Sequence, residues 1–208
     1  MPHTAAIVLA AGASRRLGRP KQLLPLHGRP LLESVVAMAA SWPVDMVVVV
    51  LGAFWEEIAD AVQFGDAVVA VNEDWPEGIA SSLRVGLDFV SRDPTYDRAF
   101  VVLGDQPSIP PDVPPGLLAA AEIGSRPALV PVYRYERANP VLFDRSLWAR
   151  LMSLEGDMGA SGILKAHPEW VKEVRFDHLP PHDVDTEADA AELDRHGGPG
   201  APGPAATG

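Results

Sequence analysis

Residues 5–21 read AAIVLAAGASRRLGRPK, an apolar run of strand length that ends in small residues and is followed by basic ones. Four of the chain's 17 Lys and Arg residues lie in residues 15–21, although the net charge of the chain is −11. Glycines allow backbone N–H groups to approach phosphate oxygens, and cations neutralise those oxygens. Open α/β sheets place ligands at the ends of apolar strands, so this loop predicts an anion site. An exposed basic turn is the alternative.

Two well-known phosphate motifs are excluded. A P-loop needs a Lys directly after its second Gly, whereas Arg19 and Pro20 stand between Gly18 and Lys21. The dinucleotide fingerprint GxGxxG is absent. The predicted anion site is therefore of another type.

The composition limits the class of protein. The 208 residues are enough for one domain with a sizeable core, and 47% of them are hydrophobic. The absence of Cys excludes disulfides, thiolate metal sites and a Cys nucleophile, and it is compatible with a reducing cytoplasm. No apolar run approaches the roughly 20 residues needed to span a bilayer, and the acidic net charge disfavours nucleic acid as a partner. We expect a cytoplasmic protein with no membrane or nucleic-acid partner.

Apolar periodicity predicts alternating strands and helices, which is typical of a three-layer, doubly wound α/β fold with a mostly parallel sheet. The continuous β-branched run at 47–50 suits a strand buried on both faces. We expect one domain over residues 1–196 and a disordered Gly/Pro/Ala tail over 197–208. Strands are predicted at 5–10, 45–51, 67–71, 99–103, 128–132, 141–143 and 170–176, and helices at 30–39, 54–64, 79–90, before Gly124, at 147–151 and at 186–196.

A carboxylate follows another apolar strand. Asp105 comes directly after FVVLG at 100–104 and shortly before Pro107. The carboxyl end of a buried strand is where α/β folds place ligands and catalytic groups. Mg²⁺ prefers oxygen ligands and is often shared between carboxylates and substrate phosphates. Asp105 is therefore a candidate Mg²⁺ ligand, and capping of the following turn is the alternative.

The first loop resembles the nucleotidyltransferase signature LAAGxSxR[ML]GxxK, and the chain is similar to the MobA/MocA-like family, which couples nucleotides to the molybdenum cofactor. GDQP at 104–107 matches a further motif of that family. The resemblance implies a Rossmann-like nucleotidyltransferase fold in which the loop wraps the triphosphate, Lys21 contacts its phosphates and Asp105 binds the metal. The matched loop positions are Leu9, Ala10, Ala11, Gly12, Ser14, Arg16, Leu17, Gly18 and Lys21.

A second metal ligand is implied near the C-terminus, where DVDT at 183–186 matches a family motif. By position in that motif Asp185 is the ligand, with Asp183 as the alternative. Thr186 and Asp189 also approximate a capping box for the last helix, so the segment has a structural interpretation as well. Both interpretations can hold together through different atoms.

The resemblance further implies contacts to the base and ribose of the nucleotide. Asn72 ends a predicted strand at the nucleotide edge, and Gly78 opens a GxxxSL motif that lies near base and ribose in the family. We expect Ser82 rather than Ser81 to make that contact, although serines at a helix start commonly act as caps.

The nucleotide is predicted from the first loop. Guanylyltransferases of this family carry LAGG where residues 9–12 read LAAG. A methyl group in place of a hydrogen narrows the base pocket and favours a smaller pyrimidine. The resemblance therefore implies CTP.

Two segments resemble the acceptor side of the family. ANPVLF at 138–143 is similar to G[HN]PVLF and gives Asn139 as an acceptor-binding residue; GDMGA at 156–160 is similar to GDxGAR and gives Asp157. Ala138 replaces the usual Gly, and Ser161 replaces the usual Arg, which removes a cation that could hold an acceptor phosphate. The two departures leave the nucleotide half intact and place the acceptor in doubt.

Taken together, the resemblance implies Mg²⁺-dependent transfer of CMP from CTP to the phosphate of molybdopterin, with release of pyrophosphate. Lys21 and Arg16 would stabilise charge on the triphosphate. One alternative is another phosphorylated acceptor, such as a sugar phosphate. The other is a non-catalytic accessory protein that delivers cofactor to a molybdoenzyme or its chaperone.

Overall fold

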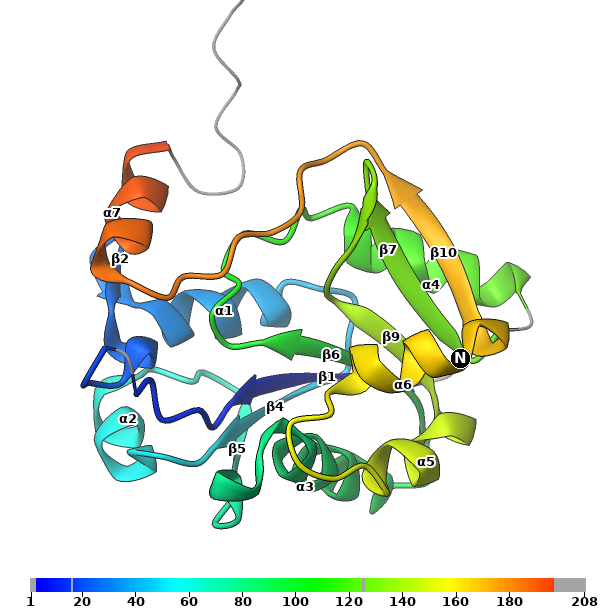
Figure 1. Cartoon of the computed structure of the whole chain (residues 1–208), viewed down its shortest axis with the longest axis horizontal. Helices are drawn as coiled ribbons and strands as arrows, with labels where there is room; N and C mark the ends of the chain where they lie inside the picture. The colour runs from blue at the N-terminus through cyan, green and yellow to red at the C-terminus, as the bar shows by residue number, and fades with distance from the viewer. Residues whose placement is uncertain (1–2, 16, 125, 197–208) are drawn as a thin grey trace, which may run out of the picture.

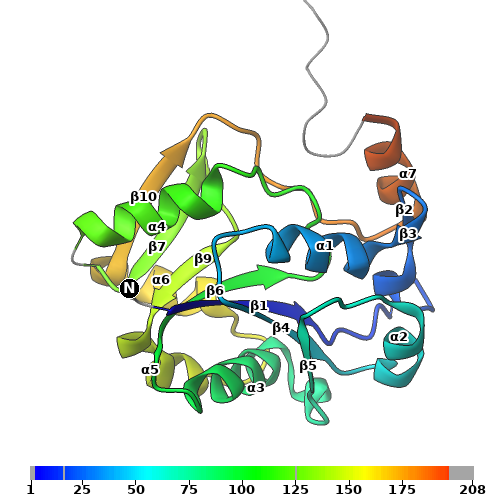
Figure 2. The same ribbon diagram turned by 180° about the vertical axis from the view of Figure 1, so that it is seen from behind.

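A sheet of eight strands runs through the middle of the protein, between helices on both faces (Figures 1 and 2). The computed structural model describes residues 3–15, 17–124 and 126–196. The strands follow the order β10-β7-β9-β6-β1-β4-β5, and β8 pairs with β7. They are β1 (His3–Ala10), β4 (Met46–Leu51), β5 (Val68–Val71), β6 (Tyr96–Leu103), β7 (Ala128–Tyr133), β8 (Glu136–Arg137), β9 (Val141–Asp144) and β10 (Val171–Phe176).

The sheet is mixed but mostly parallel. Strand β1 pairs in parallel with β4 and β6, β5 continues in parallel from β4, and β10 is parallel to β7. Strand β9 runs antiparallel to both β6 and β7. The predicted doubly wound α/β architecture is confirmed, and β10 lies at the edge of the sheet.

Helices cover both faces of the sheet because β1 is apolar on both sides. Alternate β1 residues belong to two separate buried clusters, Ala6 and Val8 to one, and Ile7 and Leu9 to the other. Helices α1 and α4 pack on the first cluster, and α3, α5 and α6 on the second. The helices are α1 (Leu31–Ala40), α2 (Trp55–Ala61), α3 (Ile79–Ser91), α4 (Val113–Ile123), α5 (Trp148–Met152), α6 (Ala160–Ala166) and α7 (Glu187–His196).

Several short elements were not predicted. The segment after Lys21 contains the turn η1 (Lys21–Leu23) and a hairpin of β2 (Pro25–Leu26) and β3 (Arg29–Pro30). Helix α6 lies partly inside a glycine-rich segment, and β8 has two residues. Elements this short contain too few residues for apolar periodicity to reveal them.

The C-terminal segment returns to the first loop. Figures 1 and 2 show α7 beside β2, although the two elements are far apart in the sequence. Val184 and Ala190 are buried in a small cluster with leucines of the N-terminal region, and Arg19 pairs with Glu187. Those leucines are Leu24, Leu26 and Leu31. The chain between β10 and α7 is thereby held against the loop that follows β1.

Two expectations have limited structural counterparts. The predicted tail at 197–208 lies outside the described residues. Among the residues that are described, no helix has both the length and the apolar character to cross a bilayer.

Candidate functional site

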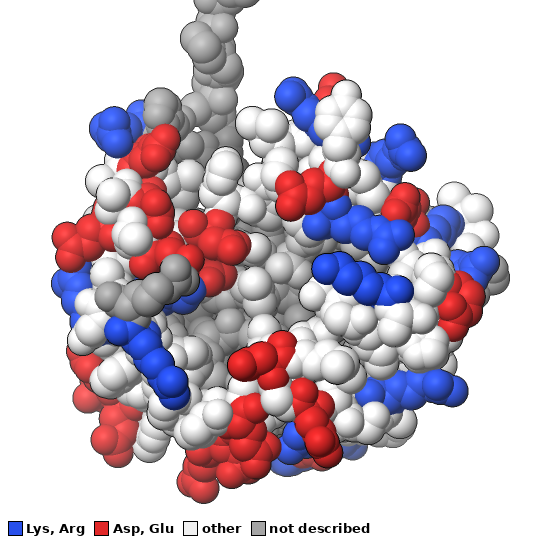
Figure 3. Space-filling view, in the orientation of Figure 1, with Lys and Arg blue, Asp and Glu red and all other residues white. Residues whose placement is uncertain are grey.

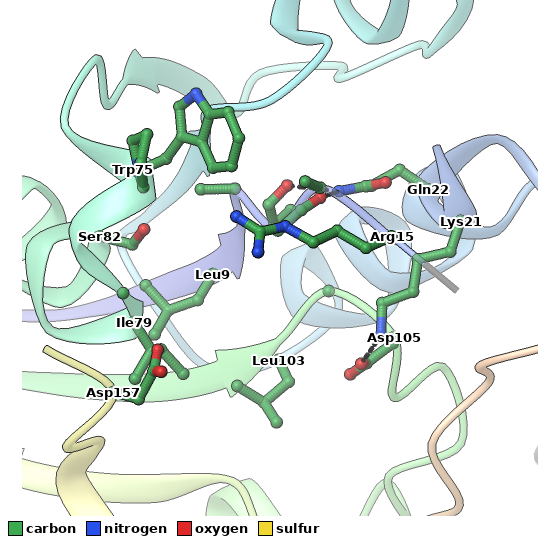
Figure 4. Close-up of a pocket in the computed structure, with 17 residues that line it drawn as sticks. Leu9, Arg15, Lys21, Gln22, Trp75, Ile79, Ser82, Leu103, Asp105 and Asp157 are labelled. Atoms are coloured by element: carbon green, nitrogen blue, oxygen red, sulfur yellow. Dashed lines mark hydrogen bonds and ion pairs between the residues drawn. The ribbon is translucent and has the colours of Figure 1, made fainter. Parts of the chain in front are cut away.

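A cavity of about 460 Å³ opens at the carboxyl ends of β1 and β6, beside the first loop (Figure 4). The loop forms one side of it, and η2 (Trp75–Glu77) with the start of α3 forms another. Segments separated by long stretches of sequence thus meet at one edge of the sheet, where α/β folds bind ligands. The predicted site residues that line it are Leu9, Ala10, Ala11, Gly12, Lys21, Gly78, Ser82, Asp105 and Asp157.

Gly104 allows the ends of β1 and β6 to approach closely. A Cβ atom at this position would lie 2.7 Å from the Cβ of Ala10. The Gly104 N–H donates to the Leu9 carbonyl over 2.8 Å. Any larger residue would separate the two strands, so glycine places Asp105 directly beside the first loop.

A buried amide holds the first loop in shape. Gln22 is 2% exposed, and its Nε2 donates to the carbonyls of Ala10 (2.7 Å) and Gly12 (3.1 Å). The Ser14 hydroxyl accepts the backbone N–H of Lys21 over 3.0 Å, with Ser14 itself at φ +49°. The loop is therefore preorganised, with Lys21 turned toward the strand ends.

The turn in this loop uses Gly18, which has φ +72° and donates its N–H to the Ser14 carbonyl. Ser14 and Gly18 shape the loop without lining the cavity. Arg16, predicted to contact the triphosphate, lies outside the described residues. Arg15 does line the cavity, and Figure 4 shows its side chain reaching across the cavity toward Ser82 and Trp75.

One ammonium group joins the two predicted metal ligands. Lys21 Nζ donates to Asp105 Oδ2 and, over 2.9 Å, to Asp185 Oδ1. The Asp105 side chain is only 13% exposed, and its other oxygen, Oδ1, is buried without a hydrogen-bond partner among the described residues. A buried, partly unsatisfied carboxylate is costly, which marks it as a group awaiting a further cation or donor.

Burial governs the protonation of this cluster. Burial raises the pKa of Asp105 above its ordinary value, and the opposing attraction of the Lys21 ammonium does not cancel that effect. Burial also acts to lower the pKa of Lys21, but Asp105 first and then Asp185 outweigh it, so the Lys21 pKa is raised. The lysine therefore stays charged, whereas Asp105 holds its proton more readily than an exposed Asp does.

The two Asp residues of the DVDT segment have different partners. Asp183 Oδ1 accepts from Gln106 Nε2 over 2.6 Å, whereas Asp185 reaches Lys21. Thr186 and Asp189 form the predicted capping box, because the Asp189 carboxylate accepts the Thr186 N–H (2.8 Å) and the Thr186 hydroxyl accepts the Asp189 N–H (3.2 Å). The cap uses neighbouring residues and leaves the Asp185 carboxylate directed at Lys21.

The donor set suits a divalent cation with hard oxygen ligands. Asp105 and Asp185 converge on one point of positive charge, and Asp105 Oδ1 has no other partner. Among the described residues, no group of three or more His, Asp or Glu side chains could enclose an ion. Two carboxylates that leave positions for phosphate oxygens and water match the way proteins bind Mg²⁺ with nucleotides.

The serines at the start of α3 are positioned by Asn72. This residue is 1% exposed, and its Nδ2 donates to the hydroxyls of Ser81 (2.8 Å) and Ser82 (3.0 Å). Only Ser82 lines the cavity; Ser81 donates to the Gly78 carbonyl. Asn72, predicted as a nucleotide contact, does not line the cavity. Its amide N–H groups donate to the two serine hydroxyls, so Asn72 orients Ser82 from behind.

Gly78 brings a distant loop onto the nucleotide cavity. Its φ is +109°, and a Cβ atom there would lie 2.5 Å from the backbone of Gly156. The Ala80 N–H donates to the Gly156 carbonyl over 3.1 Å. As a result Asp157, predicted on the acceptor side, lines the first cavity instead.

A second cavity, of about 390 Å³, adjoins the first and shares Leu9, Ile79 and Leu103 with it. Asn139 lines it and donates from Nδ2 to Gln106 Oε1 over 3.0 Å. Ala138 and Ser161, the two departures from the family pattern, line this same cavity. The structure therefore brings the predicted acceptor segments together next to the predicted nucleotide site.

Sequence reasoning did not identify several lining residues. Trp75 and Ile79 had the pattern of ordinary core residues, and Gln22 carried only the weak signal of a polar residue before two leucines. Arg15 belongs to the basic loop predicted as an anion site and Gly104 to the predicted GDQP motif, whereas the lining residues that were not predicted are Ala13, Gln22, Trp75, Pro76, Ile79 and Leu103.

Comparisons with known proteins agree with this geometry. A family model described as a MobA-like NTP transferase domain matches residues 6–171. The chain is 31% identical over 199 residues to a curated protein named nicotine blue oxidoreductase from Paenarthrobacter nicotinovorans. That match covers 89% of this chain and 94% of the relative.

Two solved structures resemble the whole chain. A homologue of Mycobacterium tuberculosis rv0371c from Mycobacterium sp. strain JC1 superimposes with a TM-score of 0.82 at 33% identity, covering 93% of this chain and 96% of that one. Rv0371c of M. tuberculosis H37Rv, in a complex with manganese, gives a TM-score of 0.77 at 28% identity, with 93% and 98% coverage. The Rossmann-like fold is thus shared along nearly the whole length.

Proposed function

Because this chain belongs to the MobA-like NTP transferase family, we propose that it transfers CMP from CTP to the phosphate of a phosphorylated pterin such as molybdopterin, and releases pyrophosphate. The observation that carries the proposal is the bridge from Lys21 to Asp105 and Asp185 at the mouth of a cavity lined by the first loop. A cation between two carboxylates beside a glycine-containing loop is suited to hold a triphosphate.

The chain's own residues position and neutralise the reacting phosphates. The backbone of the first loop and Lys21 bind the triphosphate, and Arg15 extends over it from the same loop. An acceptor phosphate oxygen attacks the α-phosphorus in line, a new O–P bond forms, and the bond to the bridging oxygen breaks as pyrophosphate leaves. The attacking phosphate is already anionic at neutral pH, so positioning and charge stabilisation suffice.

Asp105 and Asp185 would hold a divalent ion, which supplies positive charge to the phosphate oxygens when it is bound. The manganese complex of Rv0371c supports a divalent cation in this family. Before substrate binds, the Lys21 ammonium also offsets the electrostatic repulsion between the Asp105 and Asp185 carboxylates. We propose Mg²⁺ as the ion, since it is the usual partner of nucleotide phosphates.

The choice of CTP rests on the wall near Trp75. A Cβ atom built on Gly52 would lie 2.7 Å from both the Ala11 and the Trp75 Cβ atoms, so these two side chains pack side by side there. The Ala11 methyl group makes this part of the cavity shallower than a glycine at the same position would. A shallower pocket favours a pyrimidine over a purine.

The test measures pyrophosphate release with molybdenum cofactor as acceptor and CTP, GTP, ATP or UTP as donor, with Mg²⁺ or Mn²⁺. CTP-selective release supports the proposal. Release only with a sugar phosphate would change the acceptor. CTP binding without release under any condition would indicate a non-catalytic carrier.

A redox reaction is the second candidate, because a relative matched along 89% of this chain is named an oxidoreductase. It would use the same two cavities for an organic substrate. In that case the pterin would change its absorption spectrum when an electron donor or acceptor is added, and no pyrophosphate would appear. The cluster of Lys21 with Asp105 and Asp185 favours phosphate chemistry, since a lysine and two potential metal ligands suit a nucleotide triphosphate and its metal ion.

A further inference from the structure

The second cavity has an apolar floor. Strands β6, β7 and β9 and helix α6 contribute Val101, Val130, Val141 and Leu164, each at most 6% exposed. A floor of this kind gains free energy by covering a flat, uncharged body, at roughly 25 cal/mol per Å² of apolar surface removed from water. The second cavity is therefore more apolar than the first, and it suits a different part of the substrate.

Amide groups line one edge of this floor. Gln106 and Asn139 hydrogen-bond to one another, and Gln106 also donates to Asp183. Each carboxamide has two N–H donors and an acceptor oxygen, so both keep capacity for further hydrogen bonds toward the cavity. An apolar floor with an amide edge matches a planar heterocycle.

Arg137, Lys165 and Asp183 are the charged residues that line this cavity, and one of the two cations lacks an acidic partner among the described residues. Arg137 pairs with Glu173 over 2.6 Å, and Asp183 accepts from Gln106. Lys165 lines the cavity and, within the described part of the chain, forms no ion pair with an acidic side chain. In Figure 3, Lys and Arg side chains border the central hollow on the side of β7 and α6, whereas acidic side chains border the side near α7.

Helix geometry directs Lys165 over the cavity. Ser161 and Lys165 are four residues apart in α6, so they lie on the same face, and both line the cavity. Side chains of a helix lean toward its N-terminus, a direction that leads from Lys165 toward the turn that contains Ser161. The short serine side chain leaves this space open.

We propose that the second cavity binds the acceptor as a planar, uncharged ring with an anionic group, and that Lys165 binds that group. The inference rests on the proposed function, since it assigns the acceptor to this cavity. Lys165 determines specificity for an anionic acceptor and is not a catalytic residue. The alternative role for Lys165 is a favourable charge in the last turn of α6, which would affect the helix and not the ligand.

The test uses the full chain and two fluorescent probes. One is 6-hydroxymethylpterin phosphate, and the other is 6-hydroxymethylpterin, which has the same ring without the phosphate. Lys165→Ala should weaken binding of the phosphorylated probe about tenfold, the loss expected for one charge-assisted hydrogen bond. Binding of the unphosphorylated probe should not change. A structural defect in α6 would instead weaken the binding of both probes.

Three further variants sharpen the result. Lys165→Arg should restore affinity, and Ser161→Arg combined with Lys165→Ala should restore it too, because position 161 lies one turn away on the same face. Arg92→Ala removes a positive charge from the exposed end of α3, where Arg92 pairs with Asp88, and should leave both affinities unchanged.

Equal affinity of wild type and Lys165→Ala for the phosphorylated probe would overturn the inference, as would failure of the wild type to bind that probe. The proposed function fails separately, when Lys165-dependent binding occurs but no nucleotide yields pyrophosphate. Where release does occur, Lys165→Ala should raise KM for the acceptor about tenfold and leave KM for CTP unchanged.

Discussion

The backbone N–H of Val184 donates to the backbone carbonyl of Asp105 over 2.9 Å, and this hydrogen bond joins the C-terminal segment to the end of β6. Val184 is 1% exposed, so the contact is protected from water. The next residue, Asp185, consequently faces Lys21, which already contacts Asp105. The site is therefore completed by a segment that follows every strand of the sheet.

Removal of the Lys21 ammonium should affect both metal and nucleotide. In Lys21→Ala, turnover should fall by about 10²–10³ and KM for CTP should rise, since charge on the triphosphate is no longer neutralised. Without nucleotide, the same variant should bind Mn²⁺ more tightly than wild type, because no ammonium competes for the two carboxylates. Isothermal titration calorimetry with Mn²⁺ measures this affinity. A weaker affinity than that of the wild type would mean that the metal does not compete with the Lys21 ammonium for the two carboxylates.

Asp105→Asn should abolish activity without loss of stability. We expect pyrophosphate release to fall by several orders of magnitude. The melting temperature should not fall, because a neutral amide of the same shape takes the place of the buried carboxylate. Burial disfavours the charged form of that carboxylate, as its raised pKa indicates. Asp88→Asn, at an exposed pair on α3, is the matched control and should keep full activity. Near-wild-type turnover of Asp105→Asn would remove Asp105 from the metal site.

Metal affinity should depend on pH in a range set by Asp105. Only the ionised carboxylate binds a cation, and burial raises the Asp105 pKa, so protons compete at a higher pH than for an exposed Asp. Apparent Mn²⁺ affinity should therefore rise with pH through a range that lies above the ordinary pKa of an exposed Asp, about 3.9. The Asp105→Asn variant should lack this dependence on pH. If the Mn²⁺ affinity of the wild type does not change over the same pH range, the assignment of Asp105 is contradicted.

Gln22→Ala should loosen the first loop. The change leaves the Ala10 and Gly12 carbonyls without their buried donor, a loss of about 1–3 kcal/mol in the free energy of unfolding. KM for CTP should rise more than kcat falls, because the loop is no longer preorganised. Gln63→Ala, at an exposed glutamine, should change neither chemical denaturation nor KM. Unaltered denaturation of Gln22→Ala would exclude a supporting role.

Ala11→Gly should relax nucleotide selectivity. Removal of the methyl group beside Trp75 deepens that wall, and a difference of one carbon atom in a pocket is worth about 10-fold or more in discrimination. The ratio of kcat/KM for GTP over CTP should increase accordingly. Ala40→Gly, at the exposed C-terminal end of α1 and outside both cavities, is the control. An unchanged ratio in Ala11→Gly would mean that another residue selects the base.

Local patterns in the sequence were enough to predict most of the fold. The apolar run of β1 and the β-branched run of β4 are continuous because both faces of these strands are covered, and this periodicity is visible without any tertiary information. The position of Asp105 at a strand end follows from the same pattern. Helix α6 and the β2–β3 hairpin were missed because their few residues are stabilised by contacts with distant parts of the chain.

The sequence by itself determined the α/β architecture, the basic loop after β1 and the identity of Lys21 and Asp105 as candidates, because each depends on residues adjacent in the chain. Only the tertiary structure decided that Asn72 supports Ser82 from behind and that Lys165 lines the second cavity. It also brings Asp185, which the family motif already favoured over Asp183, into contact with Lys21. These relationships join residues far apart in sequence. They arise from burial of Val184 and from strand order, which local periodicity does not encode.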